Sequence, residues 1–179
     1  MDLNSDLGEG FGPWTMGDDA AMLGVVTSAN IACGGHASDP DTMFATLRMA
    51  ADRGVSIGAH PGYADRLGFG RRVIPMSPDE IARMVAAQVG ALQGVAALAG
   101  ARVRYVKAHG ALANLAADTP AVADAIAAAV QALPGGLAIL AQRARLAAGR
   151  PVLSGVEMKA ALIASAGLDV SVLPGGRGL

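Results

Sequence analysis

The sequence predicts an α/β fold with a parallel sheet, and two observations support this prediction. Short apolar runs alternate with longer segments of helical periodicity, which is the order of repeated βα units. Three of the longer segments also begin with a capping residue followed by proline, a typical helix start. The five candidate strands cover residues 2–6, 27–33, 55–59, 102–107 and 137–141.

The predicted helices begin where a capping side chain precedes a proline at the first helical position, because the missing N–H costs nothing there. The three pairs are Asp39-Pro40, Ser77-Pro78 and Thr119-Pro120. The second pair belongs to a capping-box pattern from Ser77 to Glu80, and apolar residues at helical spacing follow it. We expect this helix to continue to about Ala99 and to end at Gly100.

The length of 179 residues limits the architecture. Successive strands start at intervals close to one βα unit, so a barrel is conceivable. A complete eight-unit barrel needs about 250 residues, so this chain supplies five or six units. We therefore expect residues 1–141 to form the βα portion of an incomplete barrel, and residues 142–179 to form a divergent segment of the same domain. Within that segment we expect a helix over 156–166 and a strand over 168–173.

The composition disfavours several classes of protein. With 16% charged residues, a net charge of −1 and a pI near 6.3, the chain has no basic footprint for nucleic acid or an anionic membrane. A single cysteine excludes an internal disulfide framework and a Cys-rich zinc module. We find neither a secretory leader pattern nor an uncharged apolar run of roughly 18 to 20 residues. We therefore expect a cytoplasmic protein.

All three histidines of the chain, His36, His60 and His109, come just after apolar strand runs. In parallel α/β folds the carboxyl ends of the strands share one face, and ligands bind there. A single histidine in such a place is more often structural. The coincidence of all three favours a functional site in which the imidazoles converge.

Other polar side chains also lie at predicted strand ends. These are Asp6 and Glu9 after the first strand, Asn30 in the second, and Lys107 near the end of the fourth. The inside–outside alternation places Asp6 at the strand tip, although it could instead cap the loop. Lys107 ends an apolar strand, where a buried ammonium needs a partner or an anionic substrate unless the strand end is solvated.

Two further residues have weaker signals. Arg71 lies in a glycine-rich loop and could bind an anionic substrate group, although exposed loop arginines are more often only solvated. Cys33 could be a nucleophile, but no local feature marks its thiol pKa as lowered, and unreactive core cysteines are common. The 179 residues contain no G-x-x-x-x-G-K-[ST] motif and hence no P-loop.

These residues leave two kinds of chemistry open. Three histidines with an aspartate suit a Zn²⁺ site that activates water. The candidate ligands are Asp6, His36, His60 and His109. The alternative is metal-free acid–base catalysis by His60 and His109. In that case Asp6 would orient one imidazole, and Lys107 would hold a carboxylate or phosphate.

Five sequence blocks resemble one known family. Residues 2–12 read DLNSDLGEGFG, 28–36 read SANIACGGH, 57–63 read IGAHPGY, 68–72 read GFGRR and 106–112 read VKAHGAL. In this order they closely resemble the LamB/YcsF family of 5-oxoprolinase A subunits. The chain departs from the usual family pattern at Gly35, Ala108 and Ala113, where the family has Phe, Pro and Tyr. Residues 142–179 do not contain blocks that resemble the later family motifs.

The resemblance implies a fold, an activity and a set of site residues. The implied fold is a parallel (β/α) barrel of the glycoside hydrolase/deacetylase type. The implied activity is ATP-dependent opening of 5-oxo-L-proline to L-glutamate with two partner subunits, which would supply the ATP chemistry. The implied catalytic residues are Asp6, His36, His60, Lys107 and His109. The implied substrate-binding residues are Glu9, Asn30, Arg71 and Asn114.

Two other functions stay open at this point. One is a metal-dependent deacetylase or amidohydrolase on the same scaffold, for which a divalent metal at the histidines would be the cofactor. The other is a truncated, non-catalytic subunit, which the missing later blocks favour.

Overall fold

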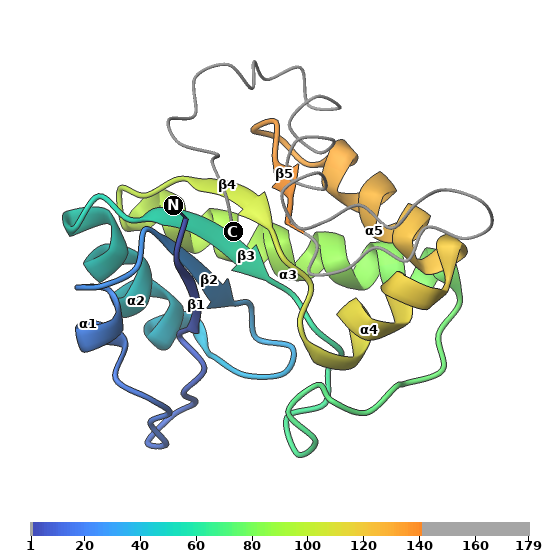
Figure 1. Ribbon diagram of the computed structural model, residues 1–179, viewed down its shortest axis with the longest axis horizontal. Helices are drawn as coiled ribbons and strands as arrows, with labels where there is room; N and C mark the ends of the chain where they lie inside the picture. The colour runs from blue at the N-terminus through green and yellow to red at the C-terminus, as the bar shows by residue number, and fades with distance from the viewer. Residues whose placement is uncertain (1, 141–179) are drawn as a thin grey trace, which may run out of the picture.

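The computed structural model of the chain describes residues 2–140, and these form a parallel sheet with helices between its strands (Figure 1). The strands are β1 (Asn4–Leu7), β2 (Ser28–Ala32), β3 (Ser56–His60), β4 (Val103–Val106) and β5 (Ala138–Ile139). They lie in the order β1-β2-β3-β4-β5, and every neighbouring pair is parallel. The predicted α/β class, the parallel sheet and the five predicted strands are confirmed.

Five helices lie between these strands. They are α1 (Asp19–Met22), α2 (Pro40–Asp52), α3 (Pro78–Leu98), α4 (Gly110–Asp118) and α5 (Pro120–Ala132). Helices α2, α3 and α5 begin at the three predicted prolines, so those predictions are confirmed. Helices α1 and α4 were not predicted. The first is only four residues long, and the second starts at a glycine after His109, which has no side-chain capping bond among the described residues.

The capping side chains explain why two of these helices start where they do. In α2, Asp39 Oδ1 accepts the Thr42 N–H at 2.9 Å. In α3 the capping box is complete, because Ser77 Oγ accepts the Glu80 N–H and Glu80 Oε2 accepts the Ser77 N–H. Helix α3 ends at Leu98, two residues before Gly100, which has a positive φ of 68°.

The apolar core lies between the sheet and helices α2, α3 and α5. All five residues of β2 are buried, as expected for a central parallel strand. Helix α3 contributes a buried stripe of Ile81, Val85, Val89, Leu92 and Ala96. By length and composition, α3 is the one described helix that could cross a membrane. Its apolar stripe belongs to this core, so length and composition are weak evidence that it spans one.

The described strands form an open sheet, because within residues 2–140 β1 and β5 each pair with one neighbour. Closure into a barrel therefore stays a prediction. The expected helix over 156–166, the expected strand over 168–173 and the segment 142–179 lie outside the described residues. The division of the chain at residue 141 also stays a prediction.

Replacing Ser77 with alanine tests the capping box. Ser77→Ala removes the oxygen that accepts the Glu80 N–H, so we expect the free energy of unfolding to fall by about 1 kcal/mol. Thr119→Ala is the matched control, because within residues 2–140 Thr119 precedes α5 without a side-chain capping bond, and its loss should stay below about 0.5 kcal/mol. Urea denaturation measures both, and equal losses would contradict the assigned cap.

Candidate active site

The three histidines lie together at the carboxyl ends of β2, β3 and β4, as the sequence predicted. His60 is the last residue of β3, His109 directly precedes α4, and His36 lies in the loop after β2. All three are almost completely buried. The rings of His36 and His109 stack with centroids 3.6 Å apart and planes 4° from parallel, while His60 meets both edge-on. Residues up to 73 positions apart in the chain thus form one cluster of imidazoles.

Two glycines make room for this stack. A Cβ added at Gly62 would lie 2.9 Å from His36 Nδ1, and one added at Gly70 would lie 2.7 Å from His36 Cβ and 3.0 Å from His109 Cδ2. Gly70 also has a positive φ of 60°, a conformation that side chains other than glycine rarely adopt. The glycine-rich loops after β3 therefore allow the backbone to lie directly against the rings.

Backbone carbonyls determine which nitrogen of His60 and His109 carries the proton. His60 Nδ1 lies 2.6 Å from the Lys107 carbonyl oxygen, and His109 Nε2 lies 2.8 Å from the Phe69 carbonyl oxygen. A carbonyl oxygen only accepts, so these two nitrogens are the donors and the other two keep their lone pairs. His60 Nε2 and His109 Nδ1 face each other at 3.0 Å. Two lone pairs at this distance need a proton or a metal cation near them.

Glu9 brings a carboxylate to the same place. Its Oε1 lies 3.0 Å from His36 Nε2 and 3.7 Å from His109 Nδ1. The four candidate ligand atoms of Glu9, His36, His60 and His109 all lie within 4.8 Å of one another. The sequence predicted Asp6 as the fourth metal ligand and Glu9 as a substrate-binding residue, so the geometry gives Glu9 a place in the cluster that the sequence did not assign.

Asp6 lies beside this cluster and joins it to Lys107. Its Oδ1 accepts hydrogen bonds from Lys107 Nζ at 2.6 Å and from Asn30 Nδ2 at 2.8 Å, and its Oδ2 lies 3.4 Å from His60 Nε2. The ammonium of Lys107 is buried, so the expectation that it needs a partner is confirmed and a solvated strand end is wrong. Tyr105 continues the network, because its hydroxyl donates to Asn30 Oδ1 at 2.7 Å.

The surroundings keep Asp6 charged and two of the imidazoles neutral. Burial alone would raise the pKa of the Asp6 carboxyl, but the neighbouring His60 ring and the Lys107 ammonium outweigh burial and hold that pKa far below its usual range. Burial lowers the pKa of His36, although Glu9 opposes this shift. Burial and the neighbouring His36 lower the pKa of His109 to about 4. These rings are therefore available as bases or ligands at neutral pH.

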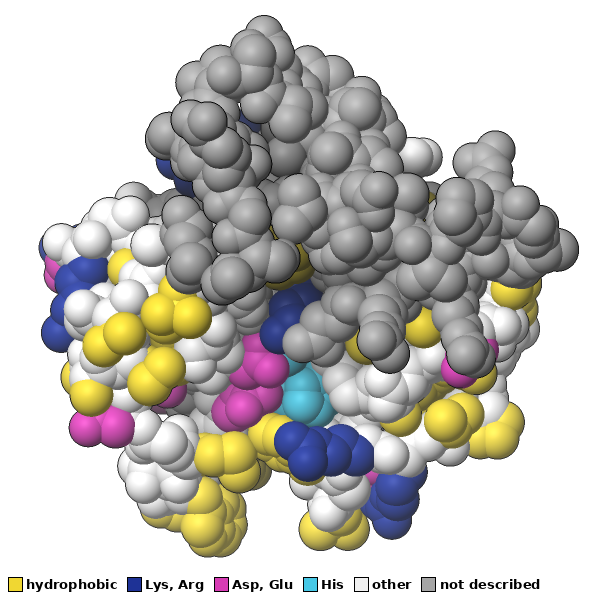
Figure 2. Space-filling model, in the orientation of Figure 1, with side chains coloured by type: hydrophobic (Ala, Val, Ile, Leu, Met, Phe, Trp, Pro, Cys, Tyr) yellow, Lys and Arg dark blue, Asp and Glu magenta, His cyan; other side chains and the backbone are white. Residues whose placement is uncertain are grey.

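A polar cavity of about 340 Å³ opens on one side of the cluster. Asp6, His60, Lys107 and His109 line it together with two predicted substrate-binding residues, Arg71 and Asn114. Figure 2 shows acidic, histidine and basic side chains close together near the middle of this face. Within the described residues the Arg71 guanidinium has no ion-pair partner, whereas Arg72 is paired with Asp65. The Arg71 guanidinium lies over the Phe69 ring, 5.3 Å from its centroid, at the border of this cavity.

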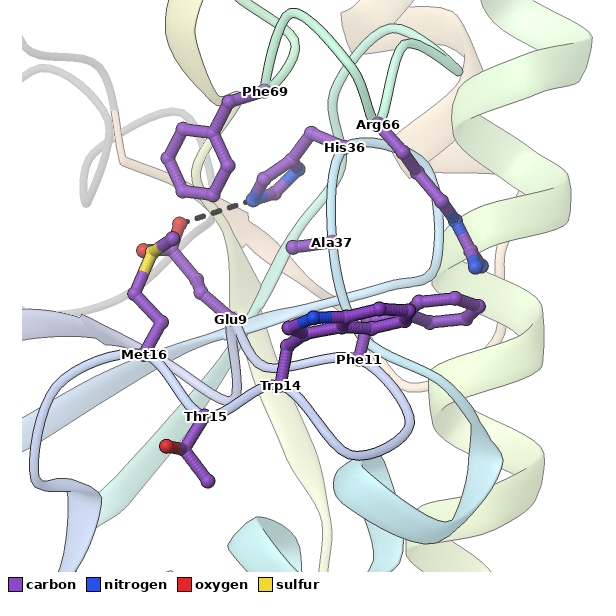
Figure 3. A pocket seen from close by; sticks show the side chains of 9 residues that line it. All are labelled: Glu9, Phe11, Trp14, Thr15, Met16, His36, Ala37, Arg66 and Phe69. Atoms are coloured by element: carbon purple, nitrogen blue, oxygen red, sulfur yellow. Dashed lines mark hydrogen bonds and ion pairs between the residues drawn. The ribbon is translucent and has the colours of Figure 1, made fainter.

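A smaller, apolar cavity of about 180 Å³ lies on the Glu9 and His36 side of the cluster. Figure 3 shows Phe69 and Met16 beside Glu9 and His36, with the rings of Trp14 and Phe11 further out. These outer rings are parallel within 7°. The sequence did not predict this cavity, because it forms only where three loops meet.

Cys33 does not have the surroundings of a nucleophile. Its side chain is buried, and its Sγ accepts the His60 N–H at 3.2 Å. Burial raises the pKa of the thiol to about 12, so the thiolate is scarce at neutral pH. The sequence favoured an unreactive core cysteine at this position, and this geometry agrees with that interpretation.

The sequence did not indicate the parts of the site that act through the backbone. The Phe69 carbonyl fixes the His109 tautomer, and Gln88 of α3 binds the Gly62 backbone through both atoms of its side-chain amide. A backbone carbonyl has no sequence signal, and Gln88 fits the pattern of an ordinary polar position on α3. The glycine-rich block around Phe69 was the one sequence feature that indicated a close backbone approach to the site.

The fold and the site define an α/β protein with a histidine–carboxylate cluster at the carboxyl ends of its parallel strands. The family model described as "LamB/YcsF family" matches residues 1–165, and the chain belongs to this family. The predicted family is thus confirmed.

Several curated relatives are named as 5-oxoprolinase A subunits. One from Gluconobacter oxydans is 55% identical over 141 residues, which cover 79% of this chain and 56% of the relative. One from Rhodopseudomonas palustris is 59% identical over 138 residues, covering 76% of this chain and 54% of the relative. The chain therefore spans little more than half the length of these relatives.

A solved structure from Thermus thermophilus, described as a lactam utilization protein, has the same fold. It superposes with a TM-score of 0.78 at 38% sequence identity, over 93% of this chain and 63% of that chain. This agreement supports the parallel α/β architecture independently of the sheet pairing.

Replacing Gly70 with alanine tests how tightly the stack is held. Gly70→Ala places a Cβ against His36 and His109, so we expect their ring signals in NMR spectra to shift and the free energy of unfolding to fall by about 3 kcal/mol. Gly100→Ala is the matched control, since it has a similar positive φ of 68° but nothing within 4 Å of the added Cβ. It should lose only about 1 kcal/mol and leave the ring signals unchanged. Identical spectra for both variants would contradict the close packing.

The metal-free chain should lose stability as the pH falls from about 6.5 to about 4. In this range the unfolded chain binds a proton at His109 that the folded chain does not, so acid favours unfolding. Melting temperatures measured with a chelator present across this range give the slope. His109→Gln should flatten it, and an unchanged slope would show that His109 is not the group responsible.

Proposed function

We propose that this chain provides the ring-opening site of an ATP-dependent 5-oxoprolinase, which converts 5-oxo-L-proline to L-glutamate with two other subunits. The observation that carries the proposal is the cluster of imidazoles and carboxylates that borders a polar cavity containing Arg71 and Lys107. The names of the relatives support the same reaction, because each is called a 5-oxoprolinase subunit. An ATP-dependent reaction of this kind fits a cytoplasmic protein.

The chemistry of the lactam explains why ATP is needed. A five-membered lactam is a poor electrophile, and phosphorylation of its amide oxygen makes the ring carbon easier to attack. Water then adds to that carbon and the C–N bond breaks, which leaves an acyl phosphate that a second water hydrolyses. The net reaction consumes one ATP and two waters to give glutamate, ADP and phosphate. The 179 residues contain no P-loop, so we assign the phosphorylation to the partner subunits and the ring opening to this chain.

The polar cavity suits a small anionic cyclic amide. Arg71 and Asn114 line the side of the cavity formed by the loop after β3 and by α4, and we assign them to the substrate carboxylate. Lys107, held by Asp6, supplies positive charge beside the lactam carbonyl oxygen or the phosphoryl group on it. Asn30 donates a hydrogen bond to Asp6 and so holds that carboxylate in place. The part that Asn30 plays in substrate binding is therefore indirect.

His60 and His109 are assigned to proton transfer. His60 Nε2 keeps its lone pair, borders the cavity and lies 3.4 Å from the Asp6 carboxylate, which would stabilise a protonated ring. It can therefore take a proton from the attacking water. His109 Nδ1 lies 3.0 Å away and can pass a proton toward the departing nitrogen.

The donor set also fits a divalent metal. Three imidazole nitrogens and the Glu9 carboxylate lie within 4.8 Å of one another, and two of the rings donate their other N–H to backbone carbonyls, an arrangement typical of metal-ligating histidines. Glu9, His36, His60 and His109 would hold the ion, with Asp6 next to them. A metal there would lower the pKa of a water and polarise the amide.

The same observation favours one alternative function, a metal-dependent deacetylase or amidohydrolase on this scaffold. It differs from the proposed function in needing no ATP. Hydrolysis of an amide by the purified chain without ATP or partners, abolished by a chelator and restored by Zn²⁺, would establish the alternative.

Glutamate release by the complete three-subunit complex tests the proposed function. We expect release from 5-oxoproline only with ATP and both partners, and a loss of at least about 100-fold in His60→Ala and in His109→Ala. Arg71→Ala should mainly raise KM, whereas Arg48→Ala, which removes an exposed ion pair on α2, should change nothing. Full activity of both histidine variants would overturn the site assignment.

A further inference from the structure

Gln88 of α3 makes two hydrogen bonds to the backbone of one residue, Gly62, in the loop after β3. Its Nε2 donates to the Gly62 carbonyl oxygen at 2.7 Å, and the Gly62 N–H donates to its Oε1 at 3.1 Å. A primary amide is the side chain that can donate and accept in this way. Both polar groups of Gly62 are therefore fixed by one side chain from a core helix.

Gly62 in turn lies against the imidazole stack. A Cβ there would lie 2.9 Å from His36 Nδ1 and 3.2 Å from His109 Cβ, and the neighbouring Pro61 carbonyl accepts the His109 N–H at 2.8 Å. Moving the Gly62 backbone would therefore move the surface against which the His36 and His109 rings pack.

The position of the Gly62 backbone affects which ring nitrogen of His36 carries the proton. Among the described residues His36 Nδ1 is buried and has no hydrogen-bond partner, whereas Nε2 lies 3.0 Å from Glu9 Oε1. Burying an N–H without an acceptor is costly, so the proton belongs on Nε2, from which it is donated to Glu9. Gly62 keeps water away from Nδ1 and thereby favours this tautomer.

Gly35 completes the arrangement. A Cβ at residue 35 would lie 2.5–2.7 Å from the amide atoms of Gln88, so the observed position of that amide requires a glycine there. The packing of Gln88 and the absence of a side chain at residue 35 are thus coupled.

We propose that Gln88 is a positioning residue, which holds the Gly62 backbone against His36 and so sets the tautomer that donates to Glu9. The proposal rests on the proposed function only for its kinetic consequence. Its structural consequence can be measured without any activity.

NMR spectra of the histidine ring nitrogens test the structural consequence on the full chain, whose three histidines allow assignment. In the metal-free wild type we expect His36 to show the Nε2–H tautomer. Gln88→Met keeps the side-chain length but loses both hydrogen bonds, and should shift His36 toward a mixture of tautomers. Gln93→Met is the matched control on the same helix, because Gln93 donates to the Pro134 carbonyl at 2.9 Å, and it should leave the spectrum unchanged.

Two further variants keep the test decisive if Gln88→Met does not fold. Gln88→Glu can accept from the Gly62 N–H but cannot donate to its carbonyl, so it should give a smaller shift. Gly35→Ala should disturb His36 while Gln88 is intact, but should add little to the shift that Gln88→Ala already causes. An unchanged His36 spectrum in the folded variants of Gln88, or additive effects of the residue 35 and 88 changes, would overturn the proposal.

Kinetics of the complete complex test the functional consequence. We expect Gln88→Met to lower kcat about tenfold with little change in KM, and Gln93→Met to match the wild type. An unchanged kcat would overturn the positioning role. If the wild-type complex releases no glutamate, the proposed function fails, whereas the tautomer measurement still decides the role of Gln88.

Discussion

The 3.0 Å approach of His60 Nε2 to His109 Nδ1 is the constraint on which the rest of the site depends. Each ring donates an N–H hydrogen bond to a backbone carbonyl, so the two facing nitrogens are both acceptors. Such an arrangement is favourable only when a proton or a metal ion is shared between them. A shared proton and a bound metal ion are therefore two ways to satisfy the same pair of ring nitrogens.

The parallel sheet creates this constraint through Lys107. Pairing of β4 with β3 brings the Lys107 carbonyl to His60 Nδ1, while the Lys107 ammonium reaches Asp6 on β1. Lys107 thus fixes the tautomer of His60 with its backbone carbonyl and the negative charge of Asp6 with its ammonium group. Because the Asp6 carboxyl pKa is held far below its usual range, the negative charge next to His60 persists through the neutral range.

The sequence predicted those parts of the structure that depend on local patterns or on sheet geometry. Strands followed from apolar runs, three helix starts followed from capping residues before proline, and the meeting of His36, His60 and His109 followed from parallel strands. The place of Glu9 in the cluster depends on the path of a loop, which no periodicity encodes. Helix α4 lacks a side-chain cap among the described residues, and the function of Gln88 arises from a backbone contact 26 residues away.

Burial of the cluster is an argument for its chemical use. Packing three imidazoles at 1–4% exposure removes them from water, which lowers the pKa values of His36 and His109 and stabilises the fold less than apolar side chains of similar volume would. The ring nitrogens of His60 and His109 bond the Lys107 and Phe69 carbonyls, while Gly62 and Gly70 leave room for the stacked rings. Groups with shifted pKa values beside a cavity are typical of catalytic sites. Burial, shifted pKa values and the neighbouring polar cavity thus point together to chemical use of these rings.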